Sequence, residues 1–163
     1  MASKAAFTPE EWNLLRRAPM MAGLVVVAAS PSGPVGILQE TFAVGKVLAE
    51  AKAQSPGELI SSLVADLTTE EGRKAARPAD LVGKSPEQIK SNALDSLRQV
   101  GTLLDQKARP EESQAVKRWL HDTGKRVSEA AKEGGFLGLG GTQVSEQEKA
   151  ALNELGRSLG VAA

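Results

Sequence analysis

His121 is the only histidine of the chain, and histidine is the side chain best suited to proton transfer near neutral pH. Asp122 follows it directly, but adjacent helical residues point about 100° apart, so Asp122 cannot orient the imidazole. Ser128 lies seven residues on, near the same helical face. An enzyme would need a carboxylate or hydroxyl from another helix within hydrogen-bond reach of His121. We therefore predict no catalytic residue and no enzyme, with His121 as a solvated or capping side chain.

A glycine-rich stretch over residues 134–141, GGFLGLGG, precedes the last predicted helix. Its backbone amides could cradle an anion at the start of that helix. However, no lysine follows the last glycine and no strand precedes the first, so the nucleotide-loop motifs lack their context. We favour a tight connection in which Phe136, Leu137 and Leu139 enter the core, and a binding site is the alternative.

Metal-binding residues are few. The chain has no cysteine and one histidine, which argues against a transition-metal site. Carboxylates could hold Ca²⁺ or Mg²⁺, and the candidates are Glu111, Glu112, Glu146 and Glu148. Each of them falls in the first turn of a predicted helix, where an acid already interacts favourably with the helix dipole. We predict no metal site and no cofactor.

The charges are balanced, with 20 Lys and Arg against 20 Asp and Glu, and no basic run is present. A nucleic-acid partner would normally leave a basic stripe, so none is predicted. The length of 163 residues suits one domain. We expect a single domain over 1–163, with a first half at 8–77, a connector at 78–84 and a second half at 85–160.

Residues 18–39 carry no charge, which raises the question of a membrane span or a signal peptide. Pro31 and Pro34 interrupt the segment and leave only about a dozen continuous apolar residues, too few for a span. We predict two buried helices joined by a turn, in a cytoplasmic protein. The alternative is an apolar-ligand or membrane-surface hairpin formed by 18–38.

Helix starts are marked by Ser or Thr followed three residues later by an acid or amide. The pairs are Thr8 with Glu11, Ser55 with Glu58, Ser85 with Gln88, Ser145 with Glu148 and, more weakly, Thr68 with Glu71. With the helical spacing of apolar residues, they predict an all-α bundle of about six helices. The helices cover 9–29, 34–53, 56–67, 86–107, 110–132 and 146–159, with a frayed turn at 70–76. The buried stripe predicted for the second helix comprises Leu38, Phe42, Gly45, Leu48 and Ala49.

The first and last helical pairs resemble each other. Matches at a separation of 101 residues join Pro9-Glu10-Glu11 to Pro110-Glu111-Glu112, Arg17 to Arg118 and Gly23 to Gly124. They predict a duplicated helical hairpin. Chance combined with common helix-start chemistry is the alternative interpretation.

Residues 24–40, LVVVAASPSGPVGILQE, and 142–161, TQVSEQEKAALNELGRSLGV, form a pattern of helix, short turn and acid-started helix. This pattern resembles bacterial TerB-like domains of the tellurite-resistance type. The resemblance implies a helical fold in a bacterial protein. Those domains commonly carry an acidic Asp-Gly turn, whereas the turns here read SPSG at 30–33 and GGT at 140–142. The resemblance therefore implies no metal ligand at these turns.

With no catalytic arrangement, we predict a non-enzymatic protein that binds another protein or itself. Membrane contact is not favoured. The predicted interaction or ligand surface combines the tryptophan, arginines and methionines of the first helix with the apolar residues of the glycine-rich stretch. Its members are Trp12, Arg16, Arg17, Met20, Met21, Phe136, Leu137 and Leu139.

Overall fold

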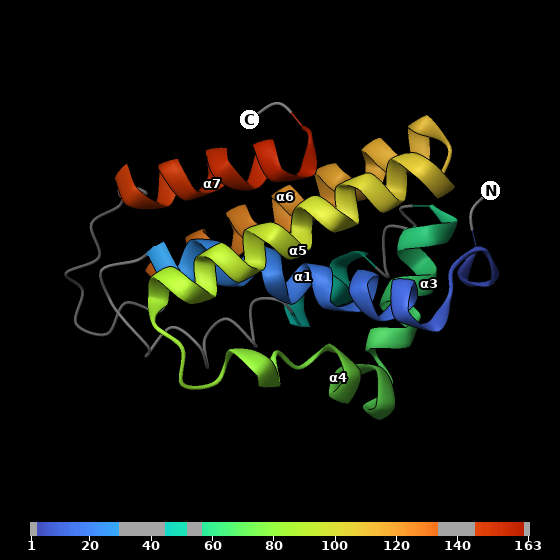
Figure 1. The fold of residues 1–163 in the computed structure, drawn as a ribbon, viewed down its shortest axis with the longest axis horizontal. Helices are drawn as coiled ribbons and strands as arrows, with labels where there is room; N and C mark the ends of the chain where they lie inside the picture. Colours follow the sequence, from blue (N-terminus) through green and yellow to red (C-terminus); the bar gives the residue numbers. More distant parts are fainter. Residues whose placement is uncertain (1–2, 30–44, 52–56, 134–145, 162–163) are drawn as a thin grey trace.

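The computed structural model describes residues 3–29, 45–51, 57–133 and 146–161 (Figure 1). This part of the chain is helical and contains no strand, which confirms the all-α prediction. Residues 45–51 are helical. The other elements are η1 (Lys4–Ala6), α1 (Pro9–Ala29), α3 (Glu58–Leu67), α4 (Glu70–Ala76), η3 (Ala79–Leu81), α5 (Pro86–Lys107), α6 (Pro110–Glu133) and α7 (Glu146–Leu159).

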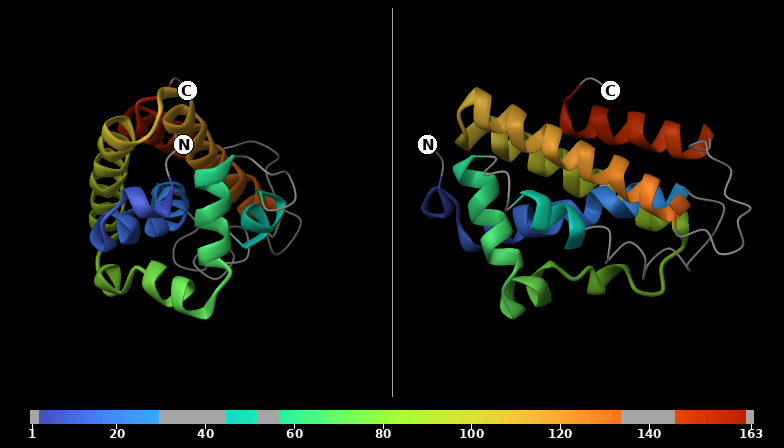
Figure 2. Two further views of the ribbon diagram at one scale, coloured as in Figure 1. Left: turned by 90° about the vertical axis from the view of Figure 1, so that its right-hand side faces the viewer. Right: turned by 180° about the vertical axis from the view of Figure 1, so that it is seen from behind.

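Four long helices form the body of the bundle. Helices α1, α5, α6 and α7 run along its long axis, while α3 crosses one end and α4 and η3 lie along one side (Figures 1 and 2). Two ion pairs show that α1 and α6 begin beside the end of α5. Lys107 of α5 contacts Glu11 of α1, and Asp105 of α5 contacts Lys117 of α6. Helices α1 and α6 are therefore parallel to each other and antiparallel to α5.

Helix α1 occupies the centre of the bundle, where it packs against α3, α4, α5, α6 and α7. Its residues 18 to 26, except the half-buried Met20, are buried, and Ala22 and Val25 are 0% exposed. A helix covered on every side can be apolar all round. Burial also explains why the β-branched run at 25–27 is helical despite its strand preference. The described half of the uncharged segment is a core helix, and residues 30–38 lie outside the described residues.

The strongest capping predictions are confirmed. The backbone amide of Thr8 donates to Glu11 (2.8 Å) and that of Glu11 to Thr8 Oγ1 (3.2 Å), so α1 begins at Pro9. Ser85 and Gln88 exchange the same two hydrogen bonds at the start of α5. Glycine at 160 ends α7 with a φ of +78°. The cap predicted at Ser145 lies outside the described residues. The cap predicted at Ser55 is wrong, because the N-cap of α3 is Gly57.

Three further predictions between residues 55 and 76 are wrong. Helix α4 is a complete short helix rather than a frayed turn, and its N-cap is Thr69, not Thr68. Thr68 is the C-cap of α3, and its hydroxyl donates back to the carbonyl of Ala65 (2.7 Å). Helix α3 begins at Glu58, two residues later than predicted, because Gly57 at its N-cap has a φ of +115°.

The buried stripe predicted for the second helix is wrong at two of the three members that the structure describes. Leu48 is half-buried and packs against the core. Gly45 and Ala49 are exposed, whereas Val47 and Ala51 are buried. An ion pair between Glu50 and Arg126 joins this helical segment to α6. The segment is helical as predicted. The face predicted to be buried, however, was aligned with Leu38 and Phe42, which lie outside the described residues.

Glycines let the central helices approach closely. A Cβ on Gly124 of α6 would lie 2.5 Å from Leu155 Cδ2 of α7 and 3.2 Å from the carbonyl oxygen of Ala22 in α1. Gly23, its predicted counterpart, is buried in the parallel helix α1. This arrangement is compatible with a duplicated hairpin, which stays a prediction. Among the described helices, none is long and apolar enough to cross a membrane.

Candidate functional site

The predicted interaction surface is largely internal where the structure describes it. Trp12 and Met21 are each 1% exposed and belong to the core, while Arg16, Arg17 and Met20 are half-buried. Phe136, Leu137 and Leu139 lie outside the described residues. The described members are thus grouped by α1, but only the two arginines and Met20 retain access to solvent.

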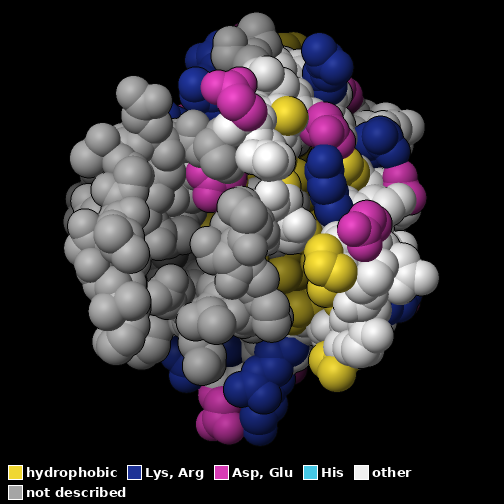
Figure 3. Space-filling model, turned by 90° about the vertical axis from the view of Figure 1, so that its left-hand side faces the viewer, with side chains coloured by type: hydrophobic (Ala, Val, Ile, Leu, Met, Phe, Trp, Pro, Cys, Tyr) yellow, Lys and Arg dark blue, Asp and Glu magenta, His cyan; other side chains and the backbone are white. Residues whose placement is uncertain are grey.

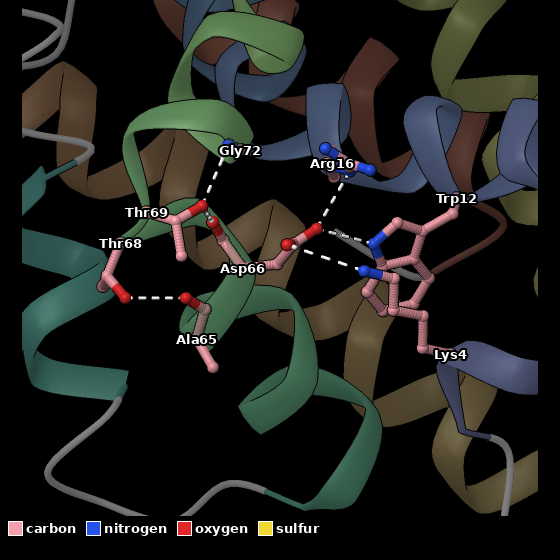
Figure 4. Close-up of polar contacts among 8 residues, drawn as sticks. All are labelled: Lys4, Trp12, Arg16, Ala65, Asp66, Thr68, Thr69 and Gly72. Carbon is pink, nitrogen blue, oxygen red and sulfur yellow. Dashed lines mark hydrogen bonds and ion pairs between the residues drawn. The ribbon is translucent and has the colours of Figure 1, made fainter.

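A single carboxylate gathers three of the polar groups around this part of α1 (Figure 4). Asp66 Oδ2 of α3 accepts a hydrogen bond from Trp12 Nε1 (2.7 Å) and forms an ion pair with Arg16 Nε (2.9 Å). Its Oδ1 lies 3.7 Å from Lys4 Nζ. The Asp66 side chain is only 18% exposed, so both oxygens hold α1, α3 and the N-terminal segment together.

The backbone of Asp66 forms the corner between α3 and α4. Its carbonyl oxygen accepts from the amide of Thr69 (3.1 Å) and from Thr69 Oγ1 (2.6 Å). Thr69 Oγ1 in turn accepts from the amide of Gly72 (2.9 Å), which caps α4. Both the side chain and the carbonyl of Asp66 are thus engaged in fixing helix positions.

We predict that Asp66→Asn lowers the free energy of unfolding by about 1–2 kcal/mol, because a partly buried charged acceptor is lost. Urea unfolding followed by tryptophan fluorescence measures the change. Asp95→Asn is the matched control, since Asp95 pairs with Arg98 on the surface with both side chains about 60% exposed. Equal effects of the two substitutions would show that Asp66 has no special structural role.

A buried lysine joins α5 to α6. Lys117 Nζ donates to both carboxylate oxygens of Asp105 (2.7 Å each), and Ser113 Oγ donates to Oδ1 (2.7 Å). The side chain of Lys117 is 3% exposed and that of Asp105 is 59% exposed. The ammonium group therefore depends on Asp105 as its anionic partner.

Two carboxyl groups at this end of the bundle have lowered pKa values. Hydrogen bonds from Lys117 and then Ser113 lower the pKa of Asp105. A hydrogen bond from Lys107, and then one from the backbone of Thr8, lowers the pKa of Glu11. Both carboxylates are stabilised in the folded state relative to the unfolded chain.

We predict that stability decreases when the pH falls below about 4, because unfolded carboxyl groups take up protons before these two folded ones. The stabilisation by these two carboxylates is complete above the pKa that carboxyl groups have in the unfolded chain. It is lost as the pH falls through the lowered pKa values of the folded state. Urea unfolding at pH 6 and pH 3 measures it. Lys107→Met and Lys117→Met should each reduce the acid-induced loss. Lys74→Met, which removes an exposed ion pair with Glu70, should not.

The histidine contacts a backbone group of the neighbouring helix. His121 Nε2 lies 3.2 Å from the carbonyl oxygen of Leu152 in α7, to which its N–H tautomer donates. The hydroxyl of Ser128 is buried and directed at Glu148 Oε2, 3.5 Å away. The structure thus gives each residue a partner in α7 and does not join the two residues to each other.

The carboxylates considered as metal ligands occupy the first turns of α6 and α7 as predicted. Glu111 is exposed, the backbone amide of Arg109 donates to Glu112 (3.4 Å), and Glu148 accepts from Ser128. No group of three or more potential ligands that could hold a metal ion occurs among residues 3–29, 45–51, 57–133 and 146–161.

Asp66 and Lys117 were missed by sequence reasoning. Asp66 is the only charged residue between Glu58 and Glu70, which marks it out within an apolar helix. Lys117 falls on the buried stripe of α6, three residues before Leu120 and one after Val116. A charge on an apolar stripe is the signal that could have identified Lys117.

No protein-family model, curated protein or solved structure matches the chain. The TerB-like resemblance consequently remains a prediction.

Proposed function

We propose that this chain is a non-enzymatic helical bundle that acts by binding another protein or a second copy of itself. The proposal includes a cytoplasmic location and no nucleic-acid partner. The observation that carries it is that side chains capable of proton transfer or ionic binding are engaged in contacts within the protein. These groups hold helices together, as the contacts of Asp66, Lys117 and His121 illustrate.

An exposed apolar side chain supplies a candidate contact. Val82, next to η3, is 83% exposed and is the only large hydrophobic residue so exposed among those described. Arg17, a member of the predicted surface, pairs with Asp80 of η3 (2.5 Å), which brings this surface to the connector. Figure 3 also shows hydrophobic side chains at the end of the bundle where α5 and α7 begin. We propose Val82 as a contact residue because most of its apolar side chain is open to solvent.

We predict that Val82→Glu weakens association with the partner by about fivefold or more, because a charge replaces an apolar contact. Light scattering coupled to size-exclusion chromatography measures self-association. A pull-down after chemical cross-linking, with the protein at its endogenous concentration, detects binding to another protein. The exposed position predicts no change in the unfolding midpoint. Gln99→Glu, at an exposed position of α5, introduces the same charge as a control.

A monomer that captures no partner in either measurement would contradict the proposed function. If association occurs and Val82→Glu and Gln99→Glu affect it equally, the assignment of Val82 is wrong while the function stands. Liposome flotation tests the competing proposal of membrane binding by 18–38. Burial of most residues from 18 to 26 argues against a membrane contact by that half of the segment.

A further inference from the structure

The N-terminal residues 3–7, here called the strap, lie across the start of α1. Residues 4–6 are exposed, whereas Phe7 is 8% exposed and its ring packs 6.0 Å from that of Trp12. The backbone is extended at Ser3 and Phe7, on either side of η1. The strap thus rests on the bundle mainly through one aromatic side chain.

Lys107 at the end of α5 contacts the strap in two ways. Its Nζ donates to the carbonyl oxygen of Ala6 (3.3 Å) and lies 5.9 Å from the centre of the Phe7 ring. The same ammonium pairs with Glu11 Oε2 of α1 (2.5 Å). Lys107 therefore fastens the strap to both α1 and α5.

The remaining fastening is weaker. Lys4 Nζ lies 3.7 Å from Asp66 Oδ1 and 5.6 Å from the centre of the Trp12 ring, and its side chain is 59% exposed. An ion pair of this length, with its ammonium group on an exposed side chain, contributes little to stability. Trp12 is held independently by its hydrogen bond to Asp66 Oδ2.

The backbone hydrogen bonds of the strap join residues of the strap to each other. The amide of Ala6 donates to the carbonyl of Ser3 (2.9 Å) and that of Phe7 to Lys4 (3.2 Å). The start of α1 is capped separately by Thr8 and Glu11. Opening the strap consequently leaves the helical hydrogen bonds of the bundle intact, which is the condition for a local rather than global transition.

We propose that the strap opens locally over Trp12 while the bundle stays folded, with Lys107 as its catch. Opening lifts Phe7 away and exposes the ring of Trp12, the most enclosed aromatic side chain of this end of α1. This conformational step is independent of the partner invoked under the proposed function.

A thiol at position 7 tests the proposal, because the natural chain contains no cysteine. In Phe7→Cys, the rate of labelling by a thiol reagent is expected to depend weakly on the urea concentration, since local opening exposes little surface. Val100→Cys, at a position of α5 that is 0% exposed, is the control for global unfolding and should depend steeply on urea. Equally steep urea dependence at both positions would overturn local opening.

The catch is tested by adding Lys107→Met to Phe7→Cys. Loss of the hydrogen bond from Lys107 to the carbonyl oxygen of Ala6, which is the contact of Lys107 with the strap that remains in this background, should accelerate labelling about three- to tenfold. Lys90→Met removes a comparable pair between α5 and α7, with Glu154 at 2.9 Å, and should leave the rate at position 7 unchanged. An unchanged rate in Lys107→Met would overturn the role of Lys107.

Trp12 fluorescence supplies a measurement that retains Phe7. In a Trp119→Phe background, acrylamide quenches Trp12 alone, because these are the only two tryptophans. Adding Lys107→Met should increase the quenching constant in the absence of urea, and adding Lys90→Met should not. Identical quenching in the two variants would contradict the strap mechanism even if position 7 were labelled rapidly.

Discussion

Gly72→Ala is expected to destabilise the protein by about 3 kcal/mol, because the new methyl group has no space. A Cβ at this position would lie 1.9 Å from the carbonyl oxygen of Asp66 and 2.7 Å from its carbonyl carbon. The neighbour is backbone, so a side-chain rotation cannot relieve the overlap. Either α4 moves away or the hydrogen bonds from Thr69 to the Asp66 carbonyl break.

Urea unfolding measures the loss, and Gly45→Ala is the matched control. Gly45 lies in the helical segment 45–51, and a Cβ there meets no atom within 4 Å. Since alanine favours helices, Gly45→Ala should be neutral or stabilising by up to about 1 kcal/mol. A Gly72→Ala protein as stable as Gly45→Ala would show that the close approach to Asp66 does not constrain the corner.

Helix boundaries could be predicted from the sequence because local chemistry sets them. The capping pairs at Thr8 and Ser85 act over three residues, and they place the starts of α1 and α5 at the observed residues. The prediction failed at Thr68 for a local reason too. Either of the two adjacent threonines could have been the N-cap of α4, and Thr69 is the one observed. The hydroxyl of Thr68 instead donates to the carbonyl of Ala65 at the end of α3.

The cluster around Asp66 could not be predicted, because it depends on residues far apart in the chain. Trp12 and Asp66 are separated by 54 residues, and their hydrogen bond requires α3 to cross the start of α1. The helical pattern shows which face of each helix is apolar. It does not show which helix covers that face, so Trp12 looked like a surface residue.

The uncharged segment illustrates the same limit. Its composition fits both a buried helix and a membrane-associated one. The outcome for 18–29 depends on how many helices surround α1, which is a property of the whole bundle. The close approach at Gly124 shows how α6 and α7 complete that cover, through a small residue that lets backbone and side chains meet.

Asp105→Ala is expected to cost about 2 kcal/mol, because it leaves the ammonium group of Lys117 buried without its anion. Removing one partner of a fully buried pair costs about 3–5 kcal/mol, and we reduce this value because Asp105 is 59% exposed. The loss should be present at pH 6. It should shrink as the pH falls through the lowered pKa of Asp105, where the natural chain also loses the charge.

Lys117→Met separates the cost of the buried charge from the value of the ion pair. Methionine keeps the length of the apolar stem and removes the ammonium group, so this variant should lie within about 1 kcal/mol of the natural chain. In the Lys117→Met background, Asp105→Ala should cost much less, with a coupling energy of about 1–2 kcal/mol in a double-mutant cycle. Additive effects would contradict this account. They would mean that Asp105 stabilises α5 through Ser113 alone, and that the ammonium group of Lys117 reaches water despite its burial.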